Sequence, residues 1–158
     1  MFRELLRKKQ RISNEECISV LKSEKRGVLS VNGDEGYPYG MPMNHFYNEN
    51  DGCIYFHCGK YGHRLDALKK DPKASFCVYD NGFRREGEWA LNVKSVVVFG
   101  KITILDDVSV IEDICEKLCY KFTDDEKYIR NELSNSAKNT LLLKMTIEDI
   151  CGKIVNES

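Results

Sequence analysis

The chain has 158 residues, of which 42% are hydrophobic and 31% charged, with a formal net charge of −1. This composition is typical of an ordinary soluble globular protein with one domain and a substantial core. The near-zero charge gives no sign of a general nucleic-acid-binding surface, and no apolar stretch approaches the length of a membrane span. The basic start MFRELLRKKQR lacks the apolar core of a secretory signal, so we expect a cytoplasmic protein.

The first elements can be read from local signals. Ser13 and Glu16 form a capping box, which predicts a short helix with Cys17, Val20 and Leu21 facing inward. A strand is predicted over residues 27–31, followed by the polar hairpin turn NGDEG at 32–36. The next strand contains Pro42, which cannot donate to a ladder and therefore marks a sheet edge or a bulge.

The most informative segment runs from Tyr37 to Arg64. Two strand-like runs are separated by the turn at 48–52, and the second ends in a glycine-rich, basic stretch that opens a helix. With residues 60–70 taken as helical, Tyr61, Leu65 and Leu68 form an apolar stripe, while Lys60, His63 and Arg64 gather near the helix start. Backbone N–H groups and cations at such a position favour a phosphate. A solvated basic face is the competing interpretation.

Beyond this helix, Asp71-Pro72 predicts a stop, residues 73–79 a strand, and residues 81–88 a mobile loop. The strongest strand pattern covers residues 95–105. Its even-numbered valines and isoleucines face one way, while Val97, Phe99 and Leu105 face the other. Both faces are apolar, so we expect a barrel strand whose outer face is covered by a helix or by a second subunit.

Residues 109–122 and 124–133 are predicted as two helices, with Val110, Ile114, Leu118 and Phe122 on the apolar stripe of the first. A final strand over residues 140–146 is followed by the segment 147–155. Helices beside many antiparallel strands indicate an α+β, mainly β fold with a closed or nearly closed barrel.

The seven cysteines are odd in number, irregularly spaced and predicted to be reduced. Cys53 and His57 would lie on one face of a strand and Cys58 on the other, and no C-x-x-C pair exists, so we expect no metal site. Cys115 and Cys119 are expected to pack in the core as small apolar groups.

The blocks GVLSV, GYPYGMPMNHFY, CIYFHCGKYGHRLDAL, ASFCVYD, SVVVFGKITIL and ICGKI closely resemble the pyridoxamine 5′-phosphate oxidase-like flavoproteins, and the nearest branch is the nitroimidazole-resistance (Nim) type. The resemblance covers residues 26–155. It implies a split β-barrel that forms a homodimer and binds flavin mononucleotide (FMN) at the subunit interface. The expected single domain comprises a helical segment (1–25), the barrel core (26–106), a helical pair (107–136) and a final strand with tail (137–158).

The resemblance also implies the residues that contact the cofactor. Close relatives carry lysine where Arg64 stands, and arginine preserves the role because it can clamp phosphate bidentately. The implied contacts are Met41, Pro42, Met43 and Asn44 along the ring edge, His57 near the ring or ribityl chain, Cys58, Gly59, Lys60, Gly62, His63 and Arg64 at the phosphate, and Ser95, Val96 and Val97 from the second subunit.

For several of these residues, packing remains an alternative. Met41 and Met43 could simply fill the core, and a hydrogen-bonded, partly buried role is the commoner one for His45 and His57. Trp89 could wall the partner's site or anchor packing. Gly152 and Lys153 fall where the family places a tail segment near the site, whereas a solvated lysine is the equal alternative.

No catalytic triad, paired-carboxylate or Walker-type pattern is present, which suits a protein whose cofactor carries the electrons. The resemblance implies hydride transfer from NADH or NADPH to FMN and then reduction of a small acceptor, a nitroaromatic compound in the Nim branch. The basic C-terminal motif of the true oxidases, arginine-leucine followed by proline, is missing from residues 150–158. A non-catalytic flavin- or heme-binding sensor or carrier, and a cofactor-free interaction protein, are the alternatives.

Overall fold

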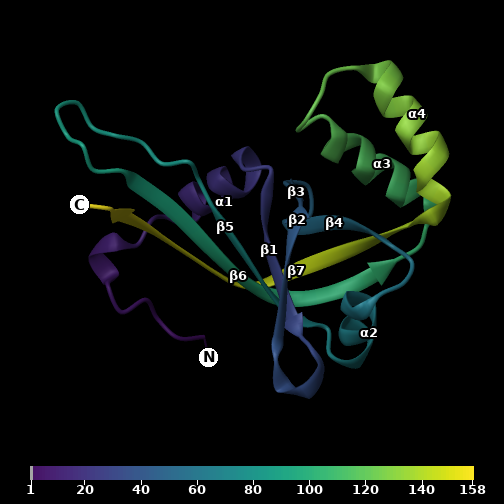
Figure 1. The fold of residues 1–158 in the computed structure, drawn as a ribbon, viewed down its shortest axis with the longest axis horizontal. Helices are drawn as coiled ribbons and strands as arrows, with labels where there is room; N and C mark the ends of the chain where they lie inside the picture. The colour runs from purple at the N-terminus through teal and green to yellow at the C-terminus, as the bar shows by residue number, and fades with distance from the viewer. Residues whose placement is uncertain (1) are drawn as a thin grey trace.

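The computed structural model describes residues 2–158, and within them seven strands form one antiparallel sheet in the order β2-β1-β5-β6-β7-β4-β3. Helices lie at its ends and edges (Figure 1). The elements are η1 (Lys8–Gln10), α1 (Asn14–Ser23), β1 (Arg26–Asn32), η2 (Asp34–Gly36), β2 (Pro38–Asn44), β3 (Phe46–Asn48), β4 (Cys53–Gly59), α2 (His63–Lys70), β5 (Lys73–Tyr79), β6 (Asn92–Leu105), α3 (Val108–Cys119), α4 (Glu126–Ser136), η3 (Ala137–Asn139) and β7 (Thr140–Asn156). The predicted α+β, mainly β class is confirmed.

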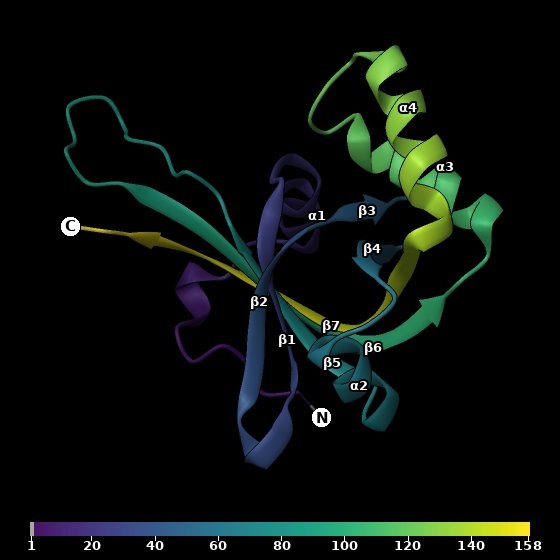
Figure 2. The ribbon, with the colours of Figure 1, turned by 45° about the vertical axis from the view of Figure 1, so that its right-hand side comes forward.

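The sheet curls because its two longest strands, β6 and β7, bend together. Their register shifts between Phe99 and Gly100, which pair with Asp149 and Ile147. One extra residue therefore bulges from β7, and such a bulge increases local twist. The β1–β2 hairpin crosses this long pair, so the sheet wraps around its own core (Figure 2). The sequence predicted a strand only to residue 146, whereas β7 continues to Asn156.

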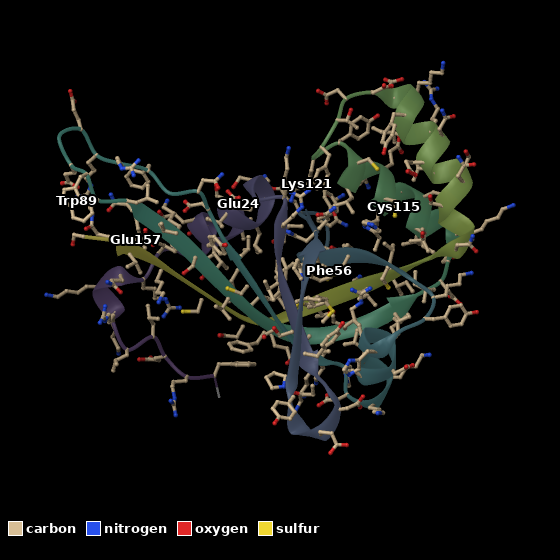
Figure 3. All side chains as sticks on the ribbon, in the orientation of Figure 1. Glu24, Phe56, Trp89, Cys115, Lys121 and Glu157 are labelled. Atoms are coloured by element: carbon tan, nitrogen blue, oxygen red, sulfur yellow. The ribbon has the colours of Figure 1, made fainter. Side chains whose placement is uncertain are left out.

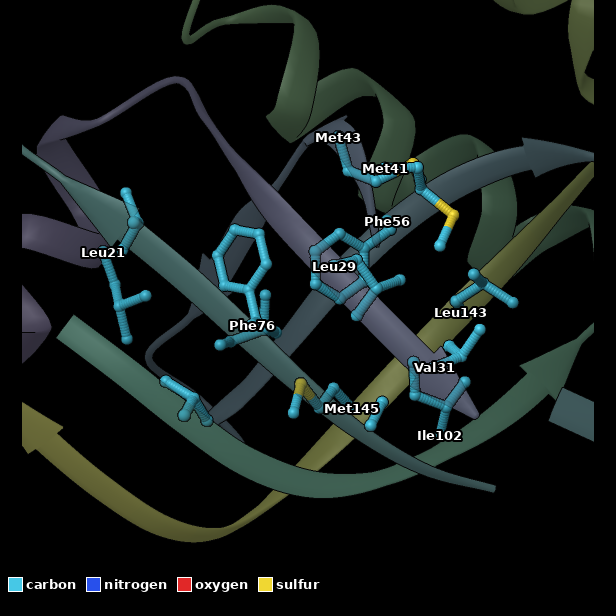
Figure 4. Packing of buried hydrophobic residues seen from close by; sticks show 14 of the residues in the cluster. Leu21, Leu29, Val31, Met41, Met43, Phe56, Phe76, Ile102, Leu143 and Met145 are labelled. Carbon is cyan, nitrogen blue, oxygen red and sulfur yellow. The ribbon is translucent and has the colours of Figure 1, made fainter. Parts of the chain in front are cut away.

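The inner face of the curled sheet holds the main core. Val96 and Val98 are fully buried and Ile102 is nearly so, as the alternation in β6 predicted. Phe56 of β4 and Phe76 of β5 meet edge to face with ring centroids 5.0 Å apart (Figure 4). Helix α1 is capped at its N-terminus by the predicted Ser13–Glu16 capping box. It buries Cys17, Val20 and Leu21, as expected.

The α3–α4 pair covers the β4–β7 end of the sheet and packs on a second, smaller core. This cluster contains Ile111 and Ile114 of α3, Ala137, and strand residues such as Tyr55 and Leu142. Helix α3 stops at Cys119, so Phe122 lies beyond it instead of completing its stripe. The predicted helices 109–122 and 124–133 are thus confirmed with shifted ends.

Lys121 fastens the helical pair to the barrel. Its ammonium group donates to the carbonyl oxygens of Glu24 at 2.6 Å, His45 at 3.0 Å and Leu21 at 3.5 Å. Burial lowers the pKa of Lys121 to about 8. Figure 3 shows Glu24 and Lys121 in the central part of the molecule and Cys115 on α3.

The segments between strands follow the predictions closely, with one correction. The edge position of Pro42, the turns at 32–36 and 48–52, β5 and the helix stop at Asp71 are all confirmed. However, α2 begins at His63 and not at residue 60. Gly62 has a φ of 126°, which is not helical, and Tyr61 is 94% exposed instead of lying on the apolar stripe.

The connection between β5 and β6 extends away from the body of the molecule, near the C-terminus (Figure 1). Trp89 lies in this connection with 75% of its surface exposed, at the opposite end of the molecule from Cys115 (Figure 3). In residues 2–158, no helix combines the length and the apolar character needed to cross a bilayer.

Candidate functional site

The β4–α2 junction exposes backbone donors. Gly59 and Gly62 have open space where a side chain would stand, and no side chain caps the helix at Gly62. The N–H groups of Leu65 and Asp66 both donate to the Gly62 carbonyl. The N–H groups of His63 and Arg64 therefore have no partner within the helix and are available to an anion.

Arg64 is the cation built into this junction. Its Nη1 donates to Met43 Sδ at 2.8 Å, and its Nε is buried without any partner. A buried donor left unpaired costs about 1–3 kcal/mol. Burial raises the pKa of the neighbouring Cys58 thiol, and the Arg64 charge opposes that rise. The guanidinium thus lies between Cys58 of β4 and Met43 of β2, and its Nε–H remains available as a hydrogen-bond donor.

The other two predicted cations lie differently. His63 turns toward the β1–β2 hairpin, where its Nε2 is 3.2 Å from Asp34 and its ring stacks on Tyr39 at 4.3 Å. Lys60 is exposed and precedes the helix, so it is not one turn from Arg64 as the predicted helix required. The expected cluster of three cations is therefore only partly assembled, and Arg64 is its half-buried member, with its Nε buried.

Strand β2 supplies a free sheet edge beside Arg64, because it pairs only with β1. Met41 and Met43 point into the barrel and are each 8% exposed, so they do pack in the core (Figure 4). Pro42 faces outward, opposite Val28 of β1, and Asn44 is half-buried at the end of the strand.

His57 lies on β4 next to Asn44, and both residues line a cavity of about 390 Å³. The residue is exposed toward this cavity, yet the surrounding protein desolvates its ring. That desolvation, followed by the Arg64 charge, lowers the pKa of His57. The far walls come from α3, α4 and the turn between them, including Phe122 and Tyr128. No sequence pattern predicts this cavity, because it depends on how the helical pair packs.

The residues expected from a second subunit lie on β6. Val96 is completely buried in its own chain and its strand pairs on both sides, with Val78 and Gly152. Ser95 and Val97 point to the opposite, outer face. Val97 lies there between Cys77 of β5 and Cys151 of β7, and Val28 continues the same row.

Three further candidates have clear surroundings. His45 is fully buried, its Nε2 donates to the Leu21 carbonyl at 2.8 Å, and burial lowers its pKa to about 4. It is therefore a neutral structural histidine at pH 7. Gly152 is buried where a Cβ would lie 2.5 Å from Cys17 Sγ, so it permits α1 to pack closely. Lys153 is exposed, and its backbone forms an isolated antiparallel β-bridge with Arg11.

The thiols and carboxylates do not form a metal centre. Within residues 2–158, no group of three or more histidine, cysteine, aspartate or glutamate side chains is placed to hold an ion. Cys115 and Cys119 are half-buried, and burial raises the pKa of Cys115 to about 11. Cys115 packs against the smaller core, as expected, and both thiols also line the cavity beneath the helices.

The family model for pyridoxamine 5′-phosphate oxidase matches residues 13–154, which include β2, the β4–α2 junction and β7. The chain belongs to the pyridoxamine 5′-phosphate oxidase family. This membership confirms the resemblance carried by the sequence blocks. No curated protein sequence matches the chain.

Solved structures share the fold of this family member. A candidate 5-nitroimidazole antibiotic resistance protein from Bacteroides thetaiotaomicron has a TM-score of 0.74 and 18% identity, covering 92% of this chain and 87% of its own. A conserved hypothetical protein from Mycobacterium tuberculosis has a TM-score of 0.79 and 14% identity, with coverages of 95% and 90%. An FAD-binding protein from Mesorhizobium loti has a TM-score of 0.66 and 22% identity, with coverages of 92% and 97%. The curled seven-stranded sheet is thus the split barrel that the sequence predicted.

Proposed function

We propose that this chain is an FMN-binding flavoprotein that uses NADH or NADPH to reduce a small acceptor such as a nitroaromatic compound. The observation that carries the proposal is the buried Nε of Arg64, unpaired beside two open N–H groups at the start of α2. An arginine held in this way is complementary to a phosphate, which would pair the guanidinium and the backbone together. Family membership and the FAD-binding neighbour from M. loti support a flavin nucleotide as the ligand that carries this phosphate.

The rest of the molecule fits the other parts of FMN. The open glycines at 59 and 62 allow close approach of a phosphate, as backbone sites for anions require. The free edge of β2 offers backbone N–H and C=O groups to the amide-like edge of the flavin ring. Met41 and Met43 anchor this strand, because their side chains pack in the core. His57 stands between these two regions, where the ribityl chain would pass.

FMN held by Arg64 and the N–H groups at the start of α2 would supply the two-electron chemistry that links a nicotinamide donor to the acceptor. The chain's own residues bind the phosphate, align the ring along β2 and limit access of water. His57 stays neutral at pH 7 because its pKa is lowered, so its ring can accept or donate a hydrogen bond at the cavity.

We further propose a homodimer with the cofactor at the subunit interface. The outer face of β1, β5 and β6 carries exposed apolar groups, including Val28 and Phe99, each 39% exposed. A second copy would cover this face and bring Ser95 and Val97 to the flavin of its neighbour. Trp89, at the far end of the protruding connection, could then reach the partner's site.

The proposal is tested by the visible spectrum of the purified protein and by the mass of the cofactor released on heating. We expect FMN, and we expect its absorbance near the flavin maximum to bleach when NADH or NADPH is added without oxygen. A protein that binds FMN but stays oxidised with both donors would favour a flavin carrier. A colourless protein that refuses added FMN would overturn the proposal.

A further inference from the structure

The cavity beneath α3 and α4 has the size of a small ligand site. Its volume of about 390 Å³ lies at the lower end of the range for ligand pockets, which suits one or two aromatic rings. Leu118 and Phe122 provide apolar wall, Tyr128 adds a second aromatic ring, and Asn44 and His57 form the floor on the sheet. An aromatic ligand would find both stacking surfaces and hydrogen-bonding groups here.

The formal charge among the residues that line the cavity is negative. Among the described residues that line the cavity, Glu132 of α4 is the one with a full charge at neutral pH, since the pKa of His57 is lowered. Burial first, and then the Glu132 and Glu116 carboxylates, raise the pKa of the Cys119 thiol. The environment therefore disfavours a second negative charge.

The nearby cations do not line the cavity. Lys25 Nζ and the Arg26 guanidinium lie 5.4 and 5.6 Å from the centroid of the Phe122 ring, but both residues line a different pocket. Lys121 adjoins Phe122 in the chain, but its ammonium group is bound to three backbone carbonyls on the barrel side. An anionic ligand in the cavity would thus lose water without contacting a lysine or arginine among the lining residues. A phosphate ester or carboxylate is disfavoured on this ground, whereas a neutral or cationic ring is not.

We infer that this cavity is the acceptor site, and that it selects flat, uncharged or cationic aromatic molecules over anionic ones. Asn44 and His57 belong both to the cavity and to the predicted flavin contacts, so a ligand here would lie against the ring edge. The inference deepens the proposed function and depends on it for the ligand's role as acceptor. The binding preference itself depends only on the cavity.

Three probes with one scaffold test the preference: 4-nitrobenzyl alcohol, 4-nitrobenzylamine and 4-nitrobenzoate. Their binding is measured by calorimetry at neutral pH without nicotinamide nucleotide, on the FMN-loaded protein and again on the FMN-free protein. We expect the alcohol and the amine to bind, and the benzoate to bind roughly tenfold more weakly than the amine, since attraction of one and repulsion of the other by Glu132 add together. Equal affinities for the amine and the benzoate would overturn the inference.

Paired variants locate the site. Glu132→Gln should erase most of the difference between amine and benzoate, whereas Glu112→Gln, on the exposed face of α3, should leave it unchanged. Ser136→Trp should block the cavity mouth and weaken all probes at least tenfold. Its control is Ser134→Trp, an equally exposed serine on α4 that does not line the cavity. If Ser136→Trp binds all probes as the control does, the cavity is not their site.

Failure of this inference is separable from failure of the proposed function. If the FMN-free protein shows the expected charge order but never binds FMN, the cavity assignment holds and the reductase proposal falls. If FMN binds and is reduced while the three probes bind alike, the reductase proposal stands and the acceptor-site inference falls.

Discussion

Replacing Arg64 with methionine should separate the cost of this side chain in the free protein from its benefit in the complex. In the free protein its Nε is buried and unpaired, and its Nη1 reaches only a thioether sulfur, which is a weak acceptor. Methionine keeps an unbranched apolar stem of similar reach and removes the unpaired donor. We therefore expect Arg64→Met to leave the free energy of unfolding of FMN-free protein unchanged, or to raise it by up to about 2 kcal/mol.

The same change should weaken FMN binding. A charge-assisted hydrogen bond to phosphate is worth about 1.5–3 kcal/mol, which corresponds to a roughly 10- to 150-fold rise in the dissociation constant. The two backbone N–H groups of α2 would remain, so binding should weaken without disappearing.

Urea unfolding of FMN-free protein measures the first effect, and quenching of flavin fluorescence on titration measures the second. Arg130→Met is the matched control, because Arg130 pairs only with Glu126 on the exposed surface of α4. The reasoning is refuted if Arg64→Met destabilises the free protein by more than about 1 kcal/mol while FMN affinity stays at the natural value.

Three other predictions concern assembly, capping and pH. Val97→Lys should place a charge on the outer sheet face and give a monomer by light scattering, whereas Ser134→Lys, on the exposed surface of α4, should leave the dimer intact; a dimeric Val97→Lys would argue against this interface. Ser13→Ala should lower the urea unfolding free energy by about 1 kcal/mol through loss of the capping box, and an unchanged midpoint would contradict that. His45 has a pKa of about 4 when folded and 6.5 when unfolded, so the unfolded state binds the extra proton and stability falls by up to about 3 kcal/mol as pH drops from 6.5 toward 4. His45→Met should flatten this dependence, leaving the smaller contribution of His57 in the same direction, and an unchanged slope would refute the assignment.

The strands were predictable because their signals are local. The alternation in β6 and β5, the turn at 48–52 and the edge position of Pro42 all follow from the two-residue period of a strand and from proline's missing donor. The even-numbered face of β6 is buried as expected. Its odd-numbered face, with Phe99 only partly covered by Phe2, still calls for a partner.

Helix α2 begins three residues later than the sequence pattern predicts, for an identifiable reason. Tyr61 fits a helical stripe with Leu65, and Lys60 stands four residues before Arg64, but periodicity alone cannot show where a helix begins. The backbone at Gly62, with a φ of 126°, breaks that continuity. Gly62 indicates the helix start better than the spacing of the basic residues does. Because the helix begins only after Gly62, the N–H groups of His63 and Arg64 have no partner within it.

Two features had no sequence signal because they depend on contacts between distant segments. Lys121 binds carbonyls of residues 76 to 100 positions away, and nothing in its local sequence distinguishes it from an exposed lysine. The cavity likewise arises where Glu132 and Phe122 of the helical pair meet His57 of β4. Only the packing of α3 and α4 against the sheet brings these groups together.

The central claim is that the β4–α2 junction binds a flavin by its phosphate. Riboflavin has the same ring and ribityl chain as FMN but lacks that phosphate, so comparing their dissociation constants isolates its contribution. We expect the natural protein to bind FMN at least about 100-fold more tightly than riboflavin, since the guanidinium and two backbone donors act together. Equal affinities for the two flavins, or no binding of either, would contradict the claim.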